Sequence, residues 1–201
     1  MDLFPNLSML DAETLDVTLL VTGLLDSLDV PYVIGGSVAS TAHGPIRSTL
    51  DVDLIADLKL RHIVPFIATL SHEFYMDEPA VRRAIERRAS FNLIHLNTMV
   101  KVDVFLSKDR PFDRQQLTRR VAERISPESD ETLWILTAED VILAKLEWFR
   151  KGGEVSERQW RDVLGVIKTQ EARLDREYLL QGAAQLNVSD LLLRAFQETD
   201  M

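Results

Sequence analysis

The sequence contains no cysteine, and its four histidines are scattered along 201 residues. A disulfide framework and a thiolate zinc site are therefore excluded, and a histidine-rich metal site is not expected. No apolar run approaches the roughly 20 residues that a membrane span requires. The first residues lack the basic start and apolar core of a signal peptide, so we expect a cytoplasmic protein without a membrane-spanning segment.

Basic residues are fewer than acidic residues. The chain has 23 Lys and Arg against 32 Asp and Glu, a formal net charge of −9. This excess of acid disfavours non-specific coating of DNA, which depends on neutralising phosphates. Arginines nevertheless gather over 82–88 and over 110–124. Such runs are usually solvated helix faces; the alternative is a contact surface for RNA or another polyanionic acceptor.

Glycine is sparse too, with 8 in the chain, and two of them stand together in Gly35-Gly36-Ser37. A short apolar run precedes them, and a small-residue segment over 37–42 is expected to form a helix. Backbone N–H groups at such a turn, a hydroxyl and a helix N-terminus together favour a phosphate. Taken alone, the two glycines are more typical of an ordinary tight turn after a strand.

Asp51 and Asp53 follow in an apolar strand, framed by Val52 and Leu54. Side chains alternate along a strand, so the two carboxylates share one face and the two apolar residues share the other. Neighbouring carboxylates repel, and a divalent cation would remove the conflict. Magnesium prefers such hard oxygen ligands, often combined with substrate phosphates. The alternative is a structural role, in which the carboxylates cap the loop or pair with Arg47.

A third carboxylate, Asp103, lies in the second of two strands expected over 91–96 and 99–106, joined by a tight turn. It shares a face with Lys101. If the intervening valines pack on helices, Asp103 faces the same side as Asp51 and Asp53. Burying a carboxylate without a partner is costly, so the alternative is an ion pair with Lys101 or an arginine.

These motifs, in this order, resemble those of the DNA polymerase β-like nucleotidyltransferase superfamily over roughly residues 32–166. The resemblance implies that the turn binds the triphosphate of an NTP and that three carboxylates bind two magnesium ions. The phosphate-binding residues it implies are Gly35, Gly36, Ser37 and, within reach of a phosphate, Arg47. The metal ligands it implies are Asp51, Asp53 and Asp103.

Two later residues are similar to those of AbiEii-type and related small bacterial transferases. Lys145 and Asp162, on successive predicted helices, match the lysine and aspartate that complete the nucleotide site in that group. The resemblance implies that Lys145 neutralises triphosphate charge and that Asp162 acts as a base or holds the acceptor. Without the resemblance, Lys145 would be a surface lysine covering Trp148, and Asp162 would pair with Arg158 one helical turn earlier.

The expected fold class is α+β: a mixed sheet flanked by helices, followed by a small helical bundle. We place a nucleotidyltransferase core over 1–126 and a C-terminal helical domain over 127–201, with a polar, turn-rich linker at 126–129. The first helix is expected over 12–29, and Ser189 is the expected cap of the last one. The apolar residues expected to pack the first helix on the sheet are Leu15, Leu19, Leu20, Leu24 and Leu28.

The implied activity is magnesium-dependent transfer of an NMP from an NTP to an acceptor hydroxyl. The acceptor is left open between an RNA or tRNA end, a small molecule such as an aminoglycoside, and a protein. The alternative function is a catalytically silent nucleotide-binding or partner-binding module, for instance one half of a toxin–antitoxin pair with a cognate antitoxin.

Overall fold

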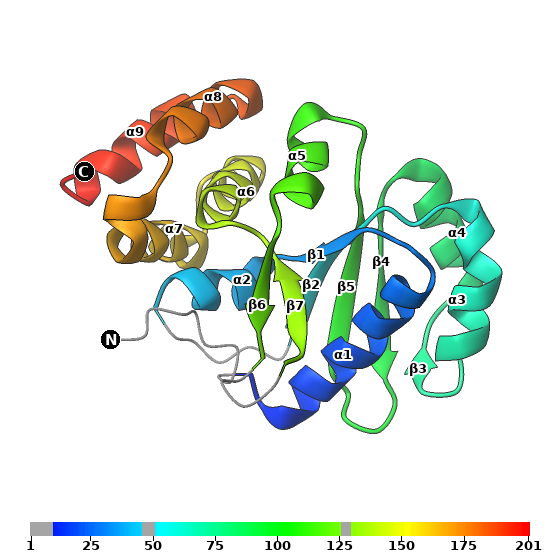
Figure 1. Cartoon of the computed structure of the whole chain (residues 1–201). Helices are drawn as coiled ribbons and strands as arrows, with labels where there is room; N and C mark the ends of the chain where they lie inside the picture. The colour runs from blue at the N-terminus through cyan, green and yellow to red at the C-terminus, as the bar shows by residue number, and fades with distance from the viewer. Residues whose placement is uncertain (1–9, 46–50, 126–129) are drawn as a thin grey trace.

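The computed structural model describes residues 10–45, 51–125 and 130–201 (Figure 1). Helices and strands alternate in the first part of the chain, and the last four long elements are helices. In chain order the elements are α1 (Ala12–Ser27), β1 (Tyr32–Ile34), α2 (Gly36–His43), β2 (Asp51–Ala56), η2 (Leu60–His62), α3 (Ile63–Leu70), β3 (Phe74–Tyr75), α4 (Glu78–Arg87), β4 (Ser90–His95), β5 (Lys101–Leu106), α5 (Pro111–Arg119), β6 (Val121–Arg124), β7 (Thr132–Ile135), α6 (Ala138–Lys151), α7 (Glu157–Gln170), η3 (Glu171–Arg173), α8 (Arg176–Leu186) and α9 (Ser189–Glu198).

The strands form one mixed sheet over the described residues, in the order β3-β4-β5-β2-β1-β7-β6. The central strands β2 and β5 run parallel, whereas β1 pairs antiparallel with β2 and β4 pairs antiparallel with β5. The expected hairpin over 91–106 is therefore confirmed. Both β2 and β5 bury every second residue deeply, because their alternating valines and leucines face one side only.

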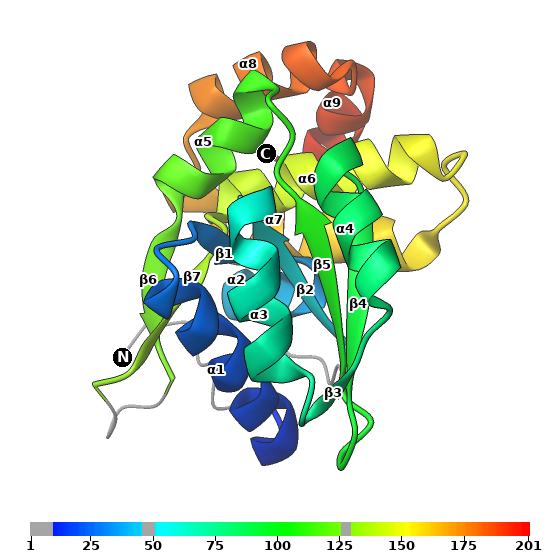
Figure 2. The same cartoon turned by 90° about the vertical axis from the view of Figure 1, so that its right-hand side faces the viewer.

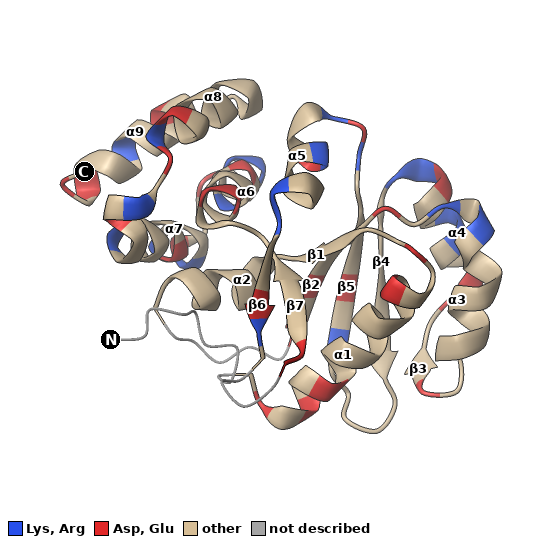
Figure 3. Cartoon of the chain, in the orientation of Figure 1, with Lys and Arg blue, Asp and Glu red and all other residues tan. Residues whose placement is uncertain are grey.

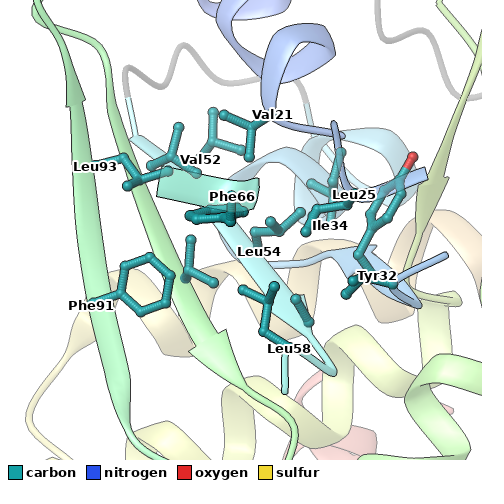
Figure 4. Close-up of a cluster of buried hydrophobic side chains, with 14 of the residues drawn as sticks. Val21, Leu25, Tyr32, Ile34, Val52, Leu54, Leu58, Phe66, Phe91 and Leu93 are labelled. Carbon is teal, nitrogen blue, oxygen red and sulfur yellow. The ribbon is translucent and has the colours of Figure 1, made fainter. Parts of the chain in front are cut away.

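Helices α1, α3 and α4 cover that apolar face of the sheet, and Figure 2 looks onto it. In Figure 4, Val21 and Leu25 of α1 and Phe66 of α3 lie near Val52 and Leu54 of β2, and all of them are at most 1% exposed. This cluster is the larger of two apolar cores and extends over β4 to Phe91 and Leu93.

Helix α1 packs on the sheet as expected, with Leu15, Leu19, Leu24 and Leu28 partly buried against the first core. Its fully buried row contains Val17, Val21 and Leu25 together with three threonines, while Leu20 is 42% exposed. The hydroxyls of Thr18 and Thr22 donate to the backbone carbonyls four residues earlier, at 2.7 and 2.9 Å. Because each hydroxyl is satisfied within the helix, threonine can be buried there.

Helices α2 and α6 lie on the opposite face; α7 and α8 pack on α6, and α9 packs against both of them (Figure 1). Their apolar side chains form a second core with Val33 of β1 and Leu136. The fold class is thus α+β, as expected. Strand β7 follows the expected boundary at 126–127 and joins the central sheet beside β1. The division into 1–126 and 127–201 stays a prediction, and the linker at 126–129 lies outside the described residues.

Capping residues begin most of the long helices. The side chains of Asp11, Thr137 and Ser156 accept hydrogen bonds from backbone N–H groups in the first turns of α1, α6 and α7. The expected cap at Ser189 was wrong: α9 begins at Ser189, and Val188 precedes it without a side-chain cap. None of the helices in the described part of the chain is long and apolar enough to cross a membrane.

Candidate active site

The carboxylates of the two central strands lie side by side. Strands β2 and β5 pair in parallel register, with Asp53 opposite Asp103 and Asp51 opposite Lys101. Figure 3 shows the acidic bands of the two strands next to each other in the middle of the sheet. The alternation that sends Val52 and Val102 into the apolar core sends Asp53 and Asp103 to the other face, as the sequence predicted.

Electrostatic strain is concentrated at Asp53. Burial raises the pKa of the Asp53 carboxyl, and the neighbouring charge of Asp103 raises it further. The ammonium of Lys145 and the backbone amide of Ser37 act in the opposite direction without cancelling the shift. The charged form of Asp53 is therefore disfavoured, and a nearby cation would stabilise it.

Asp103 has a cation already. The ammonium of Lys101 donates to its Oδ2 at 2.7 Å, which is the ion pair that the structural reading of Asp103 required. The hydrogen bond from Lys101 to Asp103 raises the pKa of the lysine. Asp103 thus faces Asp53 on the neighbouring strand and also pairs with Lys101 on its own strand.

The glycine turn is built around Asp53. The amide of Gly35 donates to the Asp53 carbonyl at 2.9 Å, and the amide of Ser37 bonds to the Asp53 carboxylate. Gly36 has a φ of +55°, and a Cβ on it would stand 1.7 Å from the Oδ2 of Asp53. Only glycine fits there. The turn is therefore more than a chain reversal, because it holds the N-terminus of α2 against the carboxylates.

The carboxylates are a suitable donor set for magnesium, which takes hard oxygen ligands. Asp53 and Asp103 are adjacent and repel, and Asp51 lies two residues earlier on the same face. No group of three or more His, Asp or Glu side chains converges on one point within the described residues. The Oδ2 of Asp103 is paired with Lys101, and Asp51, Asp53 and Asp103 are the residues that would hold magnesium.

Lys145 and Asp162 come together at the edge of this site. The ammonium of Lys145, on α6, lies 2.8 Å from the Oδ2 of Asp162 on α7 and 3.3 Å from the Oε1 of Gln159. Lys145 is only 6% exposed, so the alternative of a surface lysine covering Trp148 was wrong. The resemblance thus pointed to two residues that the fold does bring into contact.

Arg158 is a site residue that no sequence pattern marked for phosphate contact. Its guanidinium donates to the hydroxyl of Ser37 at 2.9 Å, across 121 positions of the chain. The alternative interpretation paired Arg158 with Asp162, and the Asp162 carboxylate accepts a hydrogen bond from Lys145. Arg158 therefore brings a positive charge to the N-terminus of α2. Arg47, which the resemblance placed within reach of a phosphate, lies outside the described residues.

A cavity of about 430 Å³ opens beside these groups. Gly35, Gly36, Asp53 and Lys145 line one end, and Gln159 lies beside them. The cavity then follows β5 toward α5 and α6, where a different set of side chains encloses it. The residues of that far end include Phe105, Lys108, Arg110, Phe112, Asp113, Glu147, Trp148 and Lys151.

Comparisons with known proteins identify the fold. No family model matches the chain, and no curated protein matches it. Among solved structures, an antigenic nucleotidyltransferase-like protein from Paracoccidioides brasiliensis is 18% identical at a TM-score of 0.61, covering 94% of this chain and 90% of that one. The chain therefore has a nucleotidyltransferase-like fold.

The antibiotic-resistance factor ANT(2'')-Ia is similar in two structures. Its solution structure is 12% identical at a TM-score of 0.51, covering 92% of this chain and 94% of its own. Its complex with adenylyl-2''-tobramycin is 13% identical at the same TM-score, covering 86% and 95%. At these identities the likeness concerns the fold, and the AbiEii-type assignment stays a prediction.

Proposed function

We propose that the protein is a magnesium-dependent nucleotidyltransferase that moves an NMP from an NTP to an acceptor hydroxyl. The observation that carries the proposal is the register of β2 and β5, which sets Asp53 beside Asp103 directly under the Gly-Gly-Ser turn. Carboxylates that repel each other have little structural value on a sheet face. Their position beside a phosphate-binding turn and a cavity supports a catalytic use.

The triphosphate would bind where α2 begins. The partial positive charge of the helix N-terminus and the hydroxyl of Ser37 favour an anion there, and Arg158 already donates to that hydroxyl at 2.9 Å. The charge of Lys145 reaches Asp53 and would offset part of the phosphate charge as well. Arg158 therefore joins Gly35, Gly36, Ser37, Lys145 and Arg47 in the proposed nucleotide-binding set.

Magnesium, as two ions held by Asp51, Asp53 and Asp103, would stabilise the charge on the phosphates and activate the hydroxyl. In the proposed reaction the acceptor oxygen forms a bond to the α-phosphorus, and the bond to the bridging oxygen of pyrophosphate breaks. The acceptor proton leaves to a carboxylate, for which Asp162 is the proposed base. Lys145 orients Asp162 through the 2.8 Å contact. Most of the rate gain would come from positioning and charge stabilisation.

The ANT(2'')-Ia complex contains adenylyl-2''-tobramycin, in which an adenylyl group is joined to an antibiotic. That protein supports the reaction class by its fold and leaves the acceptor of this chain open between RNA, a small molecule and a protein. The AbiEii-type subgroup and an antitoxin partner belong to the same proposal. They would be supported by a protein that copurifies with the chain and blocks its activity.

The decisive experiment incubates the purified protein with each α-labelled NTP and magnesium. Total RNA, an aminoglycoside panel and a protein extract are offered as acceptors in separate reactions. Label on one acceptor class, lost on addition of a chelator, is the expected result. Magnesium-dependent NTP binding by calorimetry with no label on any acceptor would instead favour the catalytically silent module. Absence of both label and NTP binding would contradict the proposed function.

A further inference from the structure

Two aromatic rings form a wall of the cavity beyond the carboxylates. Phe105 lies two residues after Asp103 on the same face of β5, and Trp148 lies one helical turn after Lys145 on α6. Their ring centroids are 5.9 Å apart at an angle of 63°. Strand β5 and helix α6, which supply Asp103 and Lys145 to the proposed active site, therefore each supply an aromatic ring to the cavity wall.

Trp148 combines an exposed side chain with a place in the cavity wall. It lines the cavity and is nevertheless 53% exposed, whereas Trp160 is 8% exposed in the second apolar core. Lys151 places its ammonium 5.4 Å from the Trp148 ring. An exposed indole in a cavity wall offers a flat surface to a ligand, and large exposed aromatic surfaces are typical of binding sites.

The carboxylates around this wall are already paired with cations. Arg110 makes two hydrogen bonds to Asp113, at 2.7 and 2.8 Å, and also pairs with Glu147. Lys151 lies 2.7 Å from Glu147. Both carboxylates at this end are therefore neutralised, and Lys108 adds one more positive charge to the lining.

The ion pairs of this network stay charged. Burial raises the pKa of the Glu147 carboxyl, but the hydrogen bonds from Arg110 and Lys151 outweigh burial and hold its pKa below the usual value. The hydrogen bonds that Arg110 donates to Asp113 and Glu147 raise the pKa of its guanidinium. An incoming polycation would have to compete with cations that are already in place. This end of the cavity thus disfavours a polyamine-like ligand and suits a ring without positive charge.

We infer that Trp148 and Phe105 form a stacking subsite for a nucleobase. The inference rests on the proposed function, because the ring would be linked to phosphates bound at the Gly35-Gly36 turn, which lines the same cavity. Every nucleobase has a flat π face that stacks on an aromatic side chain. The base belongs either to the NTP or to the end of a nucleotide acceptor, and both present the same ring chemistry to Trp148.

The test measures ligand binding by tryptophan fluorescence and calorimetry in the presence of magnesium. The ligands are the four NTPs, inorganic tripolyphosphate, a short RNA oligonucleotide and tobramycin. The variants are W148A and W148F. The matched control is W134F, since Trp134 lies on β7, is half-buried under the guanidinium of Arg120 and does not line the cavity.

We expect an NTP to quench the fluorescence of the unmodified protein and of W134F, and the quench to be lost in W148F. W148A should weaken NTP binding about tenfold, within the range of one stacked base, with tripolyphosphate binding unchanged. If the oligonucleotide loses affinity in W148A and the NTP does not, the subsite holds the acceptor base.

Two results would overturn the inference while leaving the proposed function intact. One is NTP and oligonucleotide binding that is equal in W148A and the unmodified protein. The other is tobramycin binding more tightly than either nucleotide ligand and depending on Trp148. If the unmodified protein binds neither NTP nor tripolyphosphate, the proposed phosphate site is refuted.

Discussion

The two faces of strands β2 and β5 are built from alternate residues of the same six-residue segments, yet they differ completely. One face presents Val52, Leu54, Val102 and Val104, none more than 1% exposed, to helices α1 and α3. The other holds three carboxylates and Lys101, and Asp53 lines the cavity. Burial of aliphatic side chains, each about 1.5–3 kcal/mol, stabilises the first face, whereas the second contains groups whose charges repel.

The repelling carboxylates stay on this strand pair because the aliphatic side chains of its opposite face pack in the core and fix the position of both strands. Neither carboxylate can move away from the other without shifting the register of valines and leucines in the core. Asp53 and Asp103 therefore stay adjacent, and a bound cation would reduce their repulsion. Five sets of variants test whether the two faces have these separate roles.

The largest expected effect is on catalysis, from the double variant D51N/D53N. Transfer of labelled NMP should fall by roughly 10³-fold or more, because the negative charges proposed to hold magnesium are gone. The melting temperature should stay equal or rise, since the repulsion around Asp53 is also removed. The control is D16N, which removes an exposed carboxylate of α1. Full activity in the double variant would refute the assignment of the site.

On the apolar face, L54A should reduce stability rather than activity. Removing this 1% exposed side chain should lower the free energy of unfolding by about 2–5 kcal/mol, measured by urea denaturation. Activity per folded molecule should change little, because Leu54 points away from the cavity. A loss of activity that exceeds the loss of folded protein would show that the two faces are not separable.

The Gly35-Gly36 turn, which lies against Asp53, should not tolerate a side chain at Gly36. G36A places a Cβ 1.7 Å from the Oδ2 of Asp53 and requires a φ of +55°. The left-handed backbone alone costs about 1–2 kcal/mol, and the displaced Asp53 should reduce activity as well. The matched control is G23A in α1, where a Cβ meets nothing within 4 Å and should stabilise the helix. Equal stability of the two variants would contradict this account.

A smaller effect is expected from Arg158. R158A should raise the KM for NTP about tenfold with a smaller change in kcat, because a charge-assisted contact to the phosphates is lost. R158K should recover part of the loss. R161A is the matched control, since Arg161 is an exposed arginine of the same helix. Identical KM values for R158A and R161A would remove Arg158 from the nucleotide site.

The smallest effect is on the pH dependence of stability, measured in metal-free buffer. The pKa of Asp53 is raised on folding, so its carboxyl favours the folded state while protonated. This contribution is complete below the unfolded pKa of about 4 and is lost as the pH rises through the folded pKa. D53N should therefore gain stability relative to the unmodified protein between pH 4 and neutral pH. A constant difference between the two proteins would indicate that Asp53 is not strained.

Much of this arrangement followed from local rules. Strand alternation predicted which face holds Asp51, Asp53 and Asp103, because the period of two admits only one answer once the valines are buried. The mixed sheet with flanking helices also followed from the order of patterns. The parallel pairing that sets Asp53 opposite Asp103 did not follow, since strands separated by some fifty residues have no local signal for their register.

The misjudged elements have physical reasons. The buried threonines of α1 were not expected because threonine counts as polar, although its hydroxyl is satisfied by the preceding turn. Ser189 was taken as a cap by residue type, whereas it is already the first helical residue and Val188 holds the cap position. Arg158 was missed because its contact with Ser37 depends on how α7 docks. The AbiEii-type subgroup, the domain boundary and the catalytic roles stay predictions.

The hydrogen bond between Arg158 and Ser37 also bears on synthesis. A ribosome releases Ser37 and the carboxylates long before α6 and α7 emerge, and domains fold largely in the order of their synthesis. The nascent sheet would then carry clustered acid with neither Lys145 nor Arg158 to attract a nucleotide. A chain that lacks α6 and α7 would therefore lack two of the positive charges that we propose bind the nucleotide.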